Sequence, residues 1–567
     1  MPSSHEHRRL CWNNDGSDML GAAYGVGAWP VPLKSVEQFI NNLTKFVEGT
    51  DVNSIFYCGH TNEPVWELIQ HNRIAARNIA ALGPDPDQAV VDFAHHNGME
   101  YFYSIRMNDI HASYFTPKLS YWPPFRREHV DLTLGYVNAA DWNGRFQPWI
   151  DKYLDIDRRR FDEDRQDDFE QELALREESR ASHPLKDVAD RVGRASRDLW
   201  SWASYDYAKP AVRARFLGIV EEACRRYDLD GIELDWCRMA MFFKQGTERR
   251  HIAVMNDFVH QVHGRLAEHG RQRGRPILLA MRVPDSIDLC LDAGLDPETW
   301  ARHGWMDLLM AGSGLMTFSI PMSEWTQLGH QHGIAVYGCI DRIAAPFGTG
   351  HPKFDSRDPE TDLDAPGRYD AVHAAAARFW DAGVDGICLY NWHTHHGPTD
   401  PRDYGKLPEV ARPDFLARAD KVYQLDPTYA RLAAHAPACV AGQLPRHFIT
   451  QAGSSILQFK LDIVDDPAAV ARARLQMQWQ RGMDQKRISV ALNGNGLPAL
   501  TPLAPDEVAG VSSIVTSTIR EGWFVSDIPP AALRQGDNEL SVTVQPATSS
   551  DPAEPVELLA VRLAVCY

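Results

Sequence analysis

Short apolar runs alternate with longer amphipathic stretches over the first four hundred residues of the chain. Segments 211–226, 252–273 and 369–382 repeat apolar residues at helical spacing, whereas the short runs have the length and composition of buried strands. Eight runs have this form: Leu10–Asn13, Ser54–Cys58, Tyr101–Ile105, Gly231–Asp235, Pro276–Met281, Asp307–Ala311, Ile334–Gly338 and Gly386–Tyr390. Strands that alternate with helices predict an α/β fold, and eight of them predict a (β/α)8 TIM barrel. An open doubly wound sheet is the alternative, but the Gly-rich nucleotide loop typical of that fold does not follow the first strand.

The pattern changes after about residue 413. A helix is expected over 415–434, completing the barrel, and period-two alternation with turn residues such as Asn493-Gly494 follows. The expected strands are 456–463, 474–479, 487–492, 522–525, 538–544 and 556–563. This alternation predicts an all-β sandwich. We therefore expect a barrel domain over 1–430, a linker over 431–449 and a sandwich domain over 450–567.

A charged segment interrupts the barrel rhythm between the third and fourth strands. Residues 154–198 mix acidic and basic side chains at helical spacing, which predicts a solvated helical insertion. Just before it, segment 114–126 is aromatic and rich in proline. It could form a wall of a substrate site or pack as an ordinary loop, and the sequence leaves both open.

Composition and charge exclude several classes of partner. The chain has 567 residues and a formal net charge of −18, so electrostatic binding of nucleic acid or of an anionic membrane is not expected. No apolar run approaches a membrane span, and the first residues lack the apolar core of a signal peptide. Nine cysteines without CxxC spacing predict free, buried thiols. We expect a cytoplasmic protein and leave a homo-oligomer open.

The fourth strand carries the most informative residues. Side chains alternate along a strand, so Glu233 and Asp235 share one face while Ile232 and Leu234 share the other. Burying unpaired carboxylates costs several kcal/mol, so this face should look into a wet or a reactive space. A structural ion pair, for example with Arg238, is the simpler explanation.

Polar side chains also gather where the other expected barrel strands end. Active sites of TIM barrels lie at the C-terminal ends of the strands, so these side chains should meet in one pocket suited to a polyol. The candidate substrate-binding residues are Asp15, Arg106, Asn108, Asp109, His111, Arg282, Trp392 and His393. No cofactor is expected.

Two segments around the fourth strand resemble a known family. Residues 205–213, Tyr-Asp-Tyr-Ala-Lys-Pro-Ala-Val-Arg, and then 227–236, Tyr-Asp-Leu-Asp-Gly-Ile-Glu-Leu-Asp-Trp, resemble the family-10-like glycosyl hydrolase barrels. The resemblance extends over residues 8–430 and implies a glycoside hydrolase. Segment 230–237 also resembles the family 18 chitinase signature, but Cys237 stands where that motif has its catalytic Glu, so chitinase chemistry is not expected. The order of motifs after residue 450 resembles the jelly-roll accessory domains of many glycoside hydrolases.

Cleavage of a glycosidic bond needs two carboxyl groups. In many glycosidase barrels the proton donor ends the fourth strand and the second carboxylate ends the seventh, which implies Asp235 and Asp341 here. Glu233, one layer deeper, would help to keep Asp235 protonated or would exchange roles with it. Trp392 would be the platform under the sugar ring.

Two other classes remain open. A metal-dependent sugar isomerase or hydrolase could use His393, His395 and His396 with a carboxylate, although the first strand has no His-x-His, and we expect no tightly bound metal. A non-catalytic carbohydrate-binding barrel is the third class, because fold does not guarantee activity.

Overall fold

The structure is a computed structural model, and only part of the chain is described. The described residues are 10–14, 35–44, 47, 50–58, 85–108, 122–165, 169–186, 202–237, 240–313, 317–341, 370–390, 407–425, 444, 446–448, 453–480, 482–503, 522–546 and 556–567.

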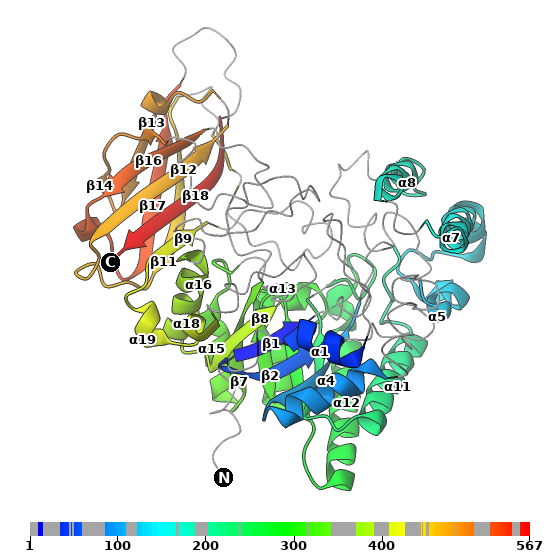
Figure 1. Cartoon of the computed structure of the whole chain (residues 1–567). Helices are drawn as coiled ribbons and strands as arrows, with labels where there is room; N and C mark the ends of the chain where they lie inside the picture. Colours follow the sequence, from blue (N-terminus) through cyan, green and yellow to red (C-terminus); the bar gives the residue numbers. More distant parts are fainter. Residues whose placement is uncertain are drawn as a thin grey trace.

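The N-terminal part is a closed barrel of eight strands that are hydrogen-bonded in the order β1 to β8 (Figure 1). Neighbouring strands are parallel throughout. The strands are β1 (Leu10–Asn14), β2 (Val52–Tyr57), β3 (Glu100–Arg106), β4 (Gly231–Asp235), β5 (Leu278–Val283), β6 (Leu308–Ala311), β7 (Ala335–Asp341) and β8 (Gly386–Tyr390). All eight expected strands and the barrel itself are therefore confirmed.

Helices cover the outside of the barrel. The three helices expected from spacing are present as α11 (Pro210–Arg226), α12 (Ile252–Arg273) and α16 (Asp370–Asp381). The other helices of the barrel region are α1 (Val36–Thr44), α4 (Pro86–His96), α13 (Ile287–Asp292), α14 (Pro297–Arg302), α15 (Met322–Gln331), α18 (Leu407–Val410) and α19 (Pro413–Leu416).

The barrel strands separate two apolar clusters. Ile232 and Leu234 belong to the large cluster between the strands and the helices. A smaller cluster, which includes Phe102, fills the inside of the barrel. β4 passes close to the ring of Phe102 at Gly231. A glycine is needed at this position, because a Cβ atom there would lie 2.1 Å from the Phe102 ring. Alternation on β4 therefore directs Glu233 and Asp235 inward, as expected.

Three aspartates lock neighbouring strands together at the N-terminal end of the barrel. Asp230 precedes β4, and its carboxylate accepts the N–H of Tyr101 at 2.9 Å, while its own N–H donates to the Tyr101 carbonyl. Asp307, before β6, makes the same pair of bonds with Leu279. Asp385, before β8, makes it with Val336. We call each pair of reciprocal bonds an aspartate clamp.

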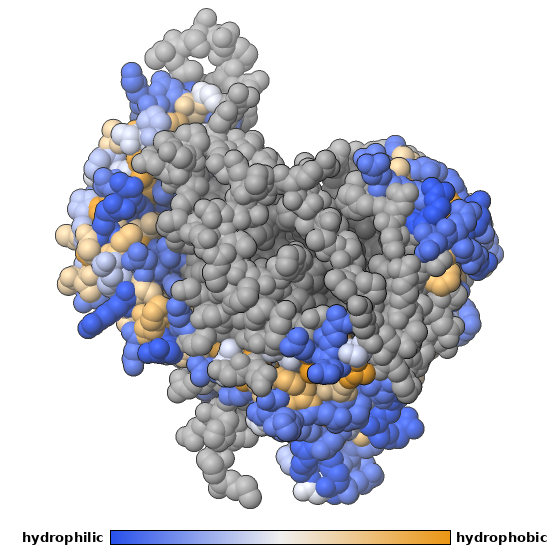
Figure 2. Space-filling view, viewed as in Figure 1, coloured by the Kyte–Doolittle hydropathy of each residue, from blue (hydrophilic) through white to orange (hydrophobic). Residues whose placement is uncertain are grey.

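The segment between β3 and β4 is a helical insertion, as expected. It contains α5 (Pro124–Glu128), α6 (Ala139–Asp141), α7 (Gln147–Asp162) and α8 (Phe169–Ala181). Figure 2 shows a mostly hydrophilic outer surface over this region. The inner side is different, because the rings of Trp122, Trp142, Trp149 and Trp202 form a buried cluster. The insertion thus has an apolar core of its own.

The C-terminal part consists of two antiparallel sheets that pack on a common core, which confirms the expected sandwich. Its strands are β9 (Lys421–Gln424), β10 (Arg446–Phe448), β11 (Ser455–Ile463), β12 (Arg472–Trp479), β13 (Ile488–Leu492), β14 (Asn495–Gly496), β15 (Thr501–Pro502), β16 (Trp523–Ile528), β17 (Gly536–Val544) and β18 (Val556–Cys566). The turn between β13 and β14 has Asn493 and Gly494 at positive φ, 53° and 82°, as a two-residue hairpin requires.

The helix expected over 415–434 is wrong for its described part. Helix α19 ends at Leu416, and residues 421–424 form β9, which pairs with β18 of the sandwich. The apolar residues of β9 were mistaken for a helical face, but pairing with β18 decides their structure. The C-terminal sheet therefore begins before residue 450.

The burial of the cysteines agrees with a further expectation. Six of the eight described cysteines are buried. Within the described ranges, no helix is both long and apolar enough to span a bilayer.

Candidate active site

Glu233 and Asp235 are the centre of the candidate site. Both lie on β4, which ends at Asp235, and they are 0% and 2% exposed. Their strand neighbours in register are Ser104 and Arg106 on β3 and Ala280 and Arg282 on β5. The C-terminal end of the barrel thus holds two buried carboxyl groups, two positions apart.

The surroundings of Glu233 favour its protonated form. Its Oε2 accepts a hydrogen bond from Asn13 Nδ2 at 2.8 Å and another from the Ser104 hydroxyl. Its Oε1 is buried and has no hydrogen-bond partner in the described part of the chain. Burial, and then the charge of Asp235, raise the pKa of Glu233 to about 7.

Asp235 is held by a buried guanidinium instead. Arg282 Nη1 lies 3.0 Å from Asp235 Oδ1 and 3.1 Å from Oδ2, and both side chains are 2% exposed. The N–H of Cys237 donates to Oδ1 at 3.0 Å. Arg282 therefore fills the role expected of a structural partner such as Arg238, which lies outside the described residues.

Arg282 connects β4 to the opposite side of the barrel. Its Nη2 donates to the Ser313 carbonyl at 2.6 Å, and its guanidinium lies 3.6 Å from the centroid of the Tyr390 ring. Tyr390 is the register partner of Asp341 on β7. The backbone position of Asp341 is thus next to the ring on which Arg282 rests, while the Asp341 side chain lies outside the described residues.

Asp285 is a third buried carboxyl group near this network. It follows β5 and is 0% exposed. Its Oδ1 accepts the N–H of Ser313 at 2.7 Å, while its Oδ2 has no hydrogen-bond partner in the described segments. Burial raises the pKa of Asp285 to about 6. Asp285 stands at the end of the fifth expected strand but is not among the expected site residues, and neither is Ser104, although alternation on β3 directs Ser104 inward with Glu233.

Asn108 and Arg106 were expected to bind substrate. The Asn108 side chain is buried and bonds three backbone groups: it donates to the carbonyls of Tyr205 and Met241 and accepts the N–H of Tyr205. These bonds tie the end of β3 to the two loops that contain Tyr205 and Met241. Arg106 is buried beside Asp235 in register.

The remaining expected site residues lie outside the described part of the chain. These are Asp15, Asp109, His111, Trp392 and His393, together with His395 and His396 of the metal alternative. Among the residues that are described, no group of three or more His, Cys, Asp or Glu side chains could hold a metal ion.

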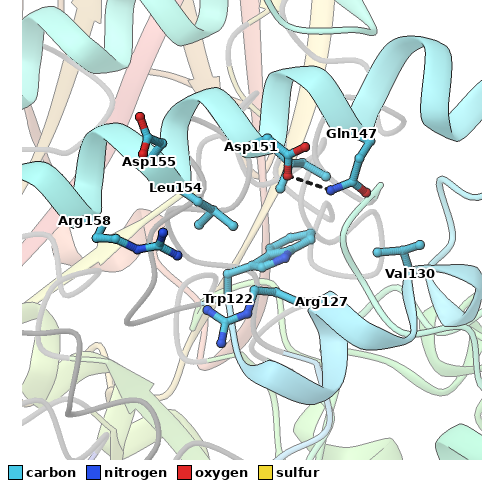
Figure 3. A pocket seen from close by; sticks show the side chains of 9 residues that line it. Trp122, Arg127, Val130, Gln147, Asp151, Leu154, Asp155 and Arg158 are labelled. Atoms are coloured by element: carbon cyan, nitrogen blue, oxygen red, sulfur yellow. Dashed lines mark hydrogen bonds between the residues drawn. The ribbon is translucent and has the colours of Figure 1, made fainter.

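A separate pocket of about 390 Å³ lies in the insertion, between α7 and residues 122–130 (Figure 3). Its wall includes Trp122 from the loop that was expected to form either a substrate wall or ordinary packing. Trp122 is 1% exposed and stacks on Trp202, so it packs inside the insertion. No barrel-strand carboxyl group lines this pocket.

The fold and the carboxyl pair define the class: a (β/α)8 barrel with titratable groups at the C-terminal ends of its strands. No protein-family model and no curated protein matches the chain. Solved structures do resemble it. Alpha-L-fucosidase isoenzyme 2 from Paenibacillus thiaminolyticus is 14% identical over 71% of this chain and 49% of that one, with a TM-score of 0.37.

Two other enzymes resemble the chain at a similar level. A GH36 alpha-galactosidase from Geobacillus stearothermophilus is 10% identical over 98% of this chain and 55% of that one, with a TM-score of 0.34. A class V chitinase from Pseudomonas fluorescens is 9% identical over 71% and 99%, with a TM-score of 0.32. The matches span about half the length of the fucosidase and the galactosidase. All three TM-scores are below 0.5, so these likenesses carry no argument about family or activity.

Proposed function

We propose that the protein is a glycoside hydrolase that uses the carboxyl pair of β4. The observation that carries this proposal is the difference in surroundings between Glu233 and Asp235. One carboxyl group is buried with a pKa raised to about 7, and the other faces a buried guanidinium at 3.0 Å. Two carboxyl groups in different protonation states are what acid-assisted cleavage of a glycosidic bond requires.

The contacts support Glu233 as the acid and Asp235 as the base or nucleophile. A protonated Glu233 retains Oε1 for a hydrogen bond to a leaving-group oxygen, and Arg282 donates to both oxygens of Asp235. This exchanges the roles that the sequence analysis gave first. The Cα atoms of residues two apart on a strand are about 6.6 Å apart, so the two carboxyl groups can reach the separations of about 5–9.5 Å between carboxyl groups that glycosidases use.

Asp341 remains the alternative second carboxylate, because β7 ends there and its register partner contacts Arg282. The resemblance of segments 205–213 and 227–236 to the family-10-like glycosyl hydrolase barrels supports the same reaction class. The substrate would be a carbohydrate bound at the mouth, with Arg106, Asp109, His111 and Trp392 among its contacts in this proposal.

The test is hydrolysis of a panel of 4-nitrophenyl glycosides, in α and β forms, by the wild type and by carboxamide variants. Asp235→Asn and Glu233→Gln should each lower turnover by about 10²–10⁴-fold, because acid and nucleophile act as a unit. The exposed Glu268, which pairs with Arg271 on α12, gives the matched control Glu268→Gln, which should keep full activity. Azide should partly restore Asp235→Gly if that carboxylate attacks the sugar.

Two outcomes would redirect the proposal. If Asp341→Asn abolishes turnover while Glu233→Gln does not, the catalytic pair is Asp235 and Asp341, and Glu233 only supports Asp235. If none of the three variants changes turnover, the β4 pair has no part in the reaction. Binding of sugars without hydrolysis would indicate the non-catalytic class.

A further inference from the structure

A series of hydrogen bonds links Asp285 to Asp235 through the backbone of Ser313 and the side chain of Arg282. The Asp285 carboxylate accepts the Ser313 N–H at 2.7 Å, and the Ser313 carbonyl accepts from Arg282 Nη2 at 2.6 Å. Arg282 Nη1 then donates to both oxygens of Asp235, at 3.0 and 3.1 Å. None of the four residues is more than 2% exposed, so water does not loosen these contacts.

This series of hydrogen bonds begins at Asp285, whose backbone is held by neighbouring elements. The Asp285 carbonyl accepts from Trp325 Nε1 at 3.0 Å, and the next residue, Ser286, caps α13. On the other side, Gly312 donates its N–H to the Val283 carbonyl and has φ +98°, a conformation that favours glycine. The loops after β5 and β6 are thus fixed against each other where the carboxylate meets the Ser313 peptide.

We propose that Asp285 is a positioning residue, which anchors the backbone of Ser313 at its N–H so that the carbonyl of the same residue holds Arg282 against Asp235. The inference rests on the proposed function of the β4 pair. Asp285 does not contact either β4 carboxyl group directly in any described contact; it acts through Ser313 and Arg282. A contact that only stabilised the loop would not lead to Arg282, whose guanidinium pairs with Asp235.

If Asp285 no longer anchors Ser313 and Arg282 moves, the pKa of Glu233 should change. The charged or titratable groups that act on Glu233 are Asp235 on β4, Arg282 on β5 and Cys388 on β8. Of these, Arg282 lowers the pKa of Glu233 and opposes burial. If Arg282 moves away, the pKa of Glu233 should therefore rise above about 7.

The experiment compares Asp285→Ala with Asp285→Asn in the full chain. An Asn side chain keeps an oxygen that can accept the Ser313 N–H, whereas Ala removes it. We expect Asp285→Ala to lower kcat/KM by about 10–100-fold, the effect of a small misplacement in an active site, and to move the alkaline limb of the pH profile upward. Asp285→Asn should keep both near the wild-type values.

Asp296→Ala is the matched control, because Asp296 also holds a backbone N–H, that of Thr299 at 3.0 Å, but caps α14 and has no described contact with Arg282. It should leave the alkaline limb in place. An unmoved limb in Asp285→Ala, whatever its turnover, would mean that Asp285 only stabilises its loop. Equal losses in the Asn and Ala variants would mean that its charge acts, not the Ser313 contact.

A second readout does not depend on activity. Asp285 has a raised pKa of its own, and its titration is absent from both Asp285→Ala and Asp285→Asn, so the pH at which the free energy of unfolding declines reports Glu233 in each variant. This pH should be higher in Asp285→Ala than in Asp285→Asn. Glu233→Gln combined with Asp285→Ala should show no such step, since the titrating group is gone. If the wild type hydrolyses no glycoside, the proposed function fails, yet an unmoved step would still overturn the positioning role independently.

Discussion

Glu233 and Asp235 stand two positions apart in one strand but have different partners. Glu233 meets neutral donors, Asn13 and Ser104, and Asp235 meets the guanidinium of Arg282. Neutral donors compensate burial only in part, whereas a charge compensates it more fully. At the scale of single residues, the neighbouring strands therefore give the two carboxyl groups different partners and raise the pKa of Glu233.

Glu233→Gln should change how stability depends on pH. The pKa of Glu233 is raised in the folded protein to about 7, above the value near 4.5 in the unfolded chain. Its contribution to stability is thus fully present below pH 4.5 and is lost as the pH rises through about 7, by roughly 3 kcal/mol for a shift of this size. The variant should remove this loss. Urea unfolding at a series of pH values from 4 to 8 measures it, and identical slopes in both proteins would contradict the assignment.

The sequence predicted the place of these residues but not their roles. Alternation alone puts Glu233 and Asp235 on the inner face, and strand ends alone put Arg282 nearby. Which group is protonated depends on the rotamer of Arg282 and on the orientation of Ser313, and both follow from packing between distant strands. Asp285 stands with Arg282 at the end of the fifth expected strand, but its contact with Ser313 depends on the loop after β6 and leaves no local pattern.

At the scale of elements, the aspartate clamps set the register of the barrel. Each clamp joins an odd strand to the next even strand, in β3–β4, β5–β6 and β7–β8. Asp51 holds the same place before β2, but the pairing of β1 with β2 shifts register there. A one-residue slip would turn Glu233 and Asp235 out of the barrel. The clamps therefore protect the site from its opposite end.

Asp385→Ala should destabilise the fold without touching the mouth of the barrel. It leaves the N–H of the buried Val336 without its carboxylate and also removes the contact with His330. We expect a loss of about 1–3 kcal/mol of unfolding free energy, the usual cost of an unsatisfied buried donor. Asp292→Ala is the control, because Asp292 makes only an exposed pair with Arg249 and should change little. Equal stability of the two variants in urea would contradict the clamp.

Elements with a strong local pattern were predictable. All eight barrel strands are short apolar runs between turns, and every one is confirmed. The segment 415–434 was misjudged because Lys421–Gln424 has too few residues to show a clear period, and its partner β18 lies more than a hundred residues later. Long-range pairing of this kind leaves no trace in a local window.

At the scale of the whole molecule, the barrel and the sandwich are joined through α16 and β9. Arg378 of α16 pairs with Asp462 of β11 at 3.1 Å. Asp465 sits at 4% exposure and accepts from Lys421 at 2.7 Å and from Tyr423 at 2.6 Å. Ala374 of α16 is buried in the core of the sandwich, so the two domains share an apolar contact and should not unfold independently.

Asp465→Ala tests the polar contacts that hold β9 within the sandwich. It leaves the ammonium of Lys421, which is 1% exposed, without its carboxylate, and breaking a buried pair in this way costs about 3–5 kcal/mol. Calorimetry should show a lower Tm for the sandwich. The neighbouring Asp466→Ala loses only an exposed bond to the Ala468 N–H and should stay close to the wild type. If Asp465→Ala melts at the same temperature as the wild type, the pair of Lys421 and Asp465 does not stabilise the protein.

The clamp before β4 has a consequence for how this chain could change over time. Asp230 sets the register of β3 and β4 by bonds between the strands themselves, so the length of the connection between them is not constrained. That connection carries the helical insertion, which packs on its own tryptophan cluster. During evolution the insertion could therefore become longer, be replaced or be lost, which would change access to the C-terminal end of the barrel. The register of β3 and β4, and with it the position of Glu233 and Asp235, would stay the same.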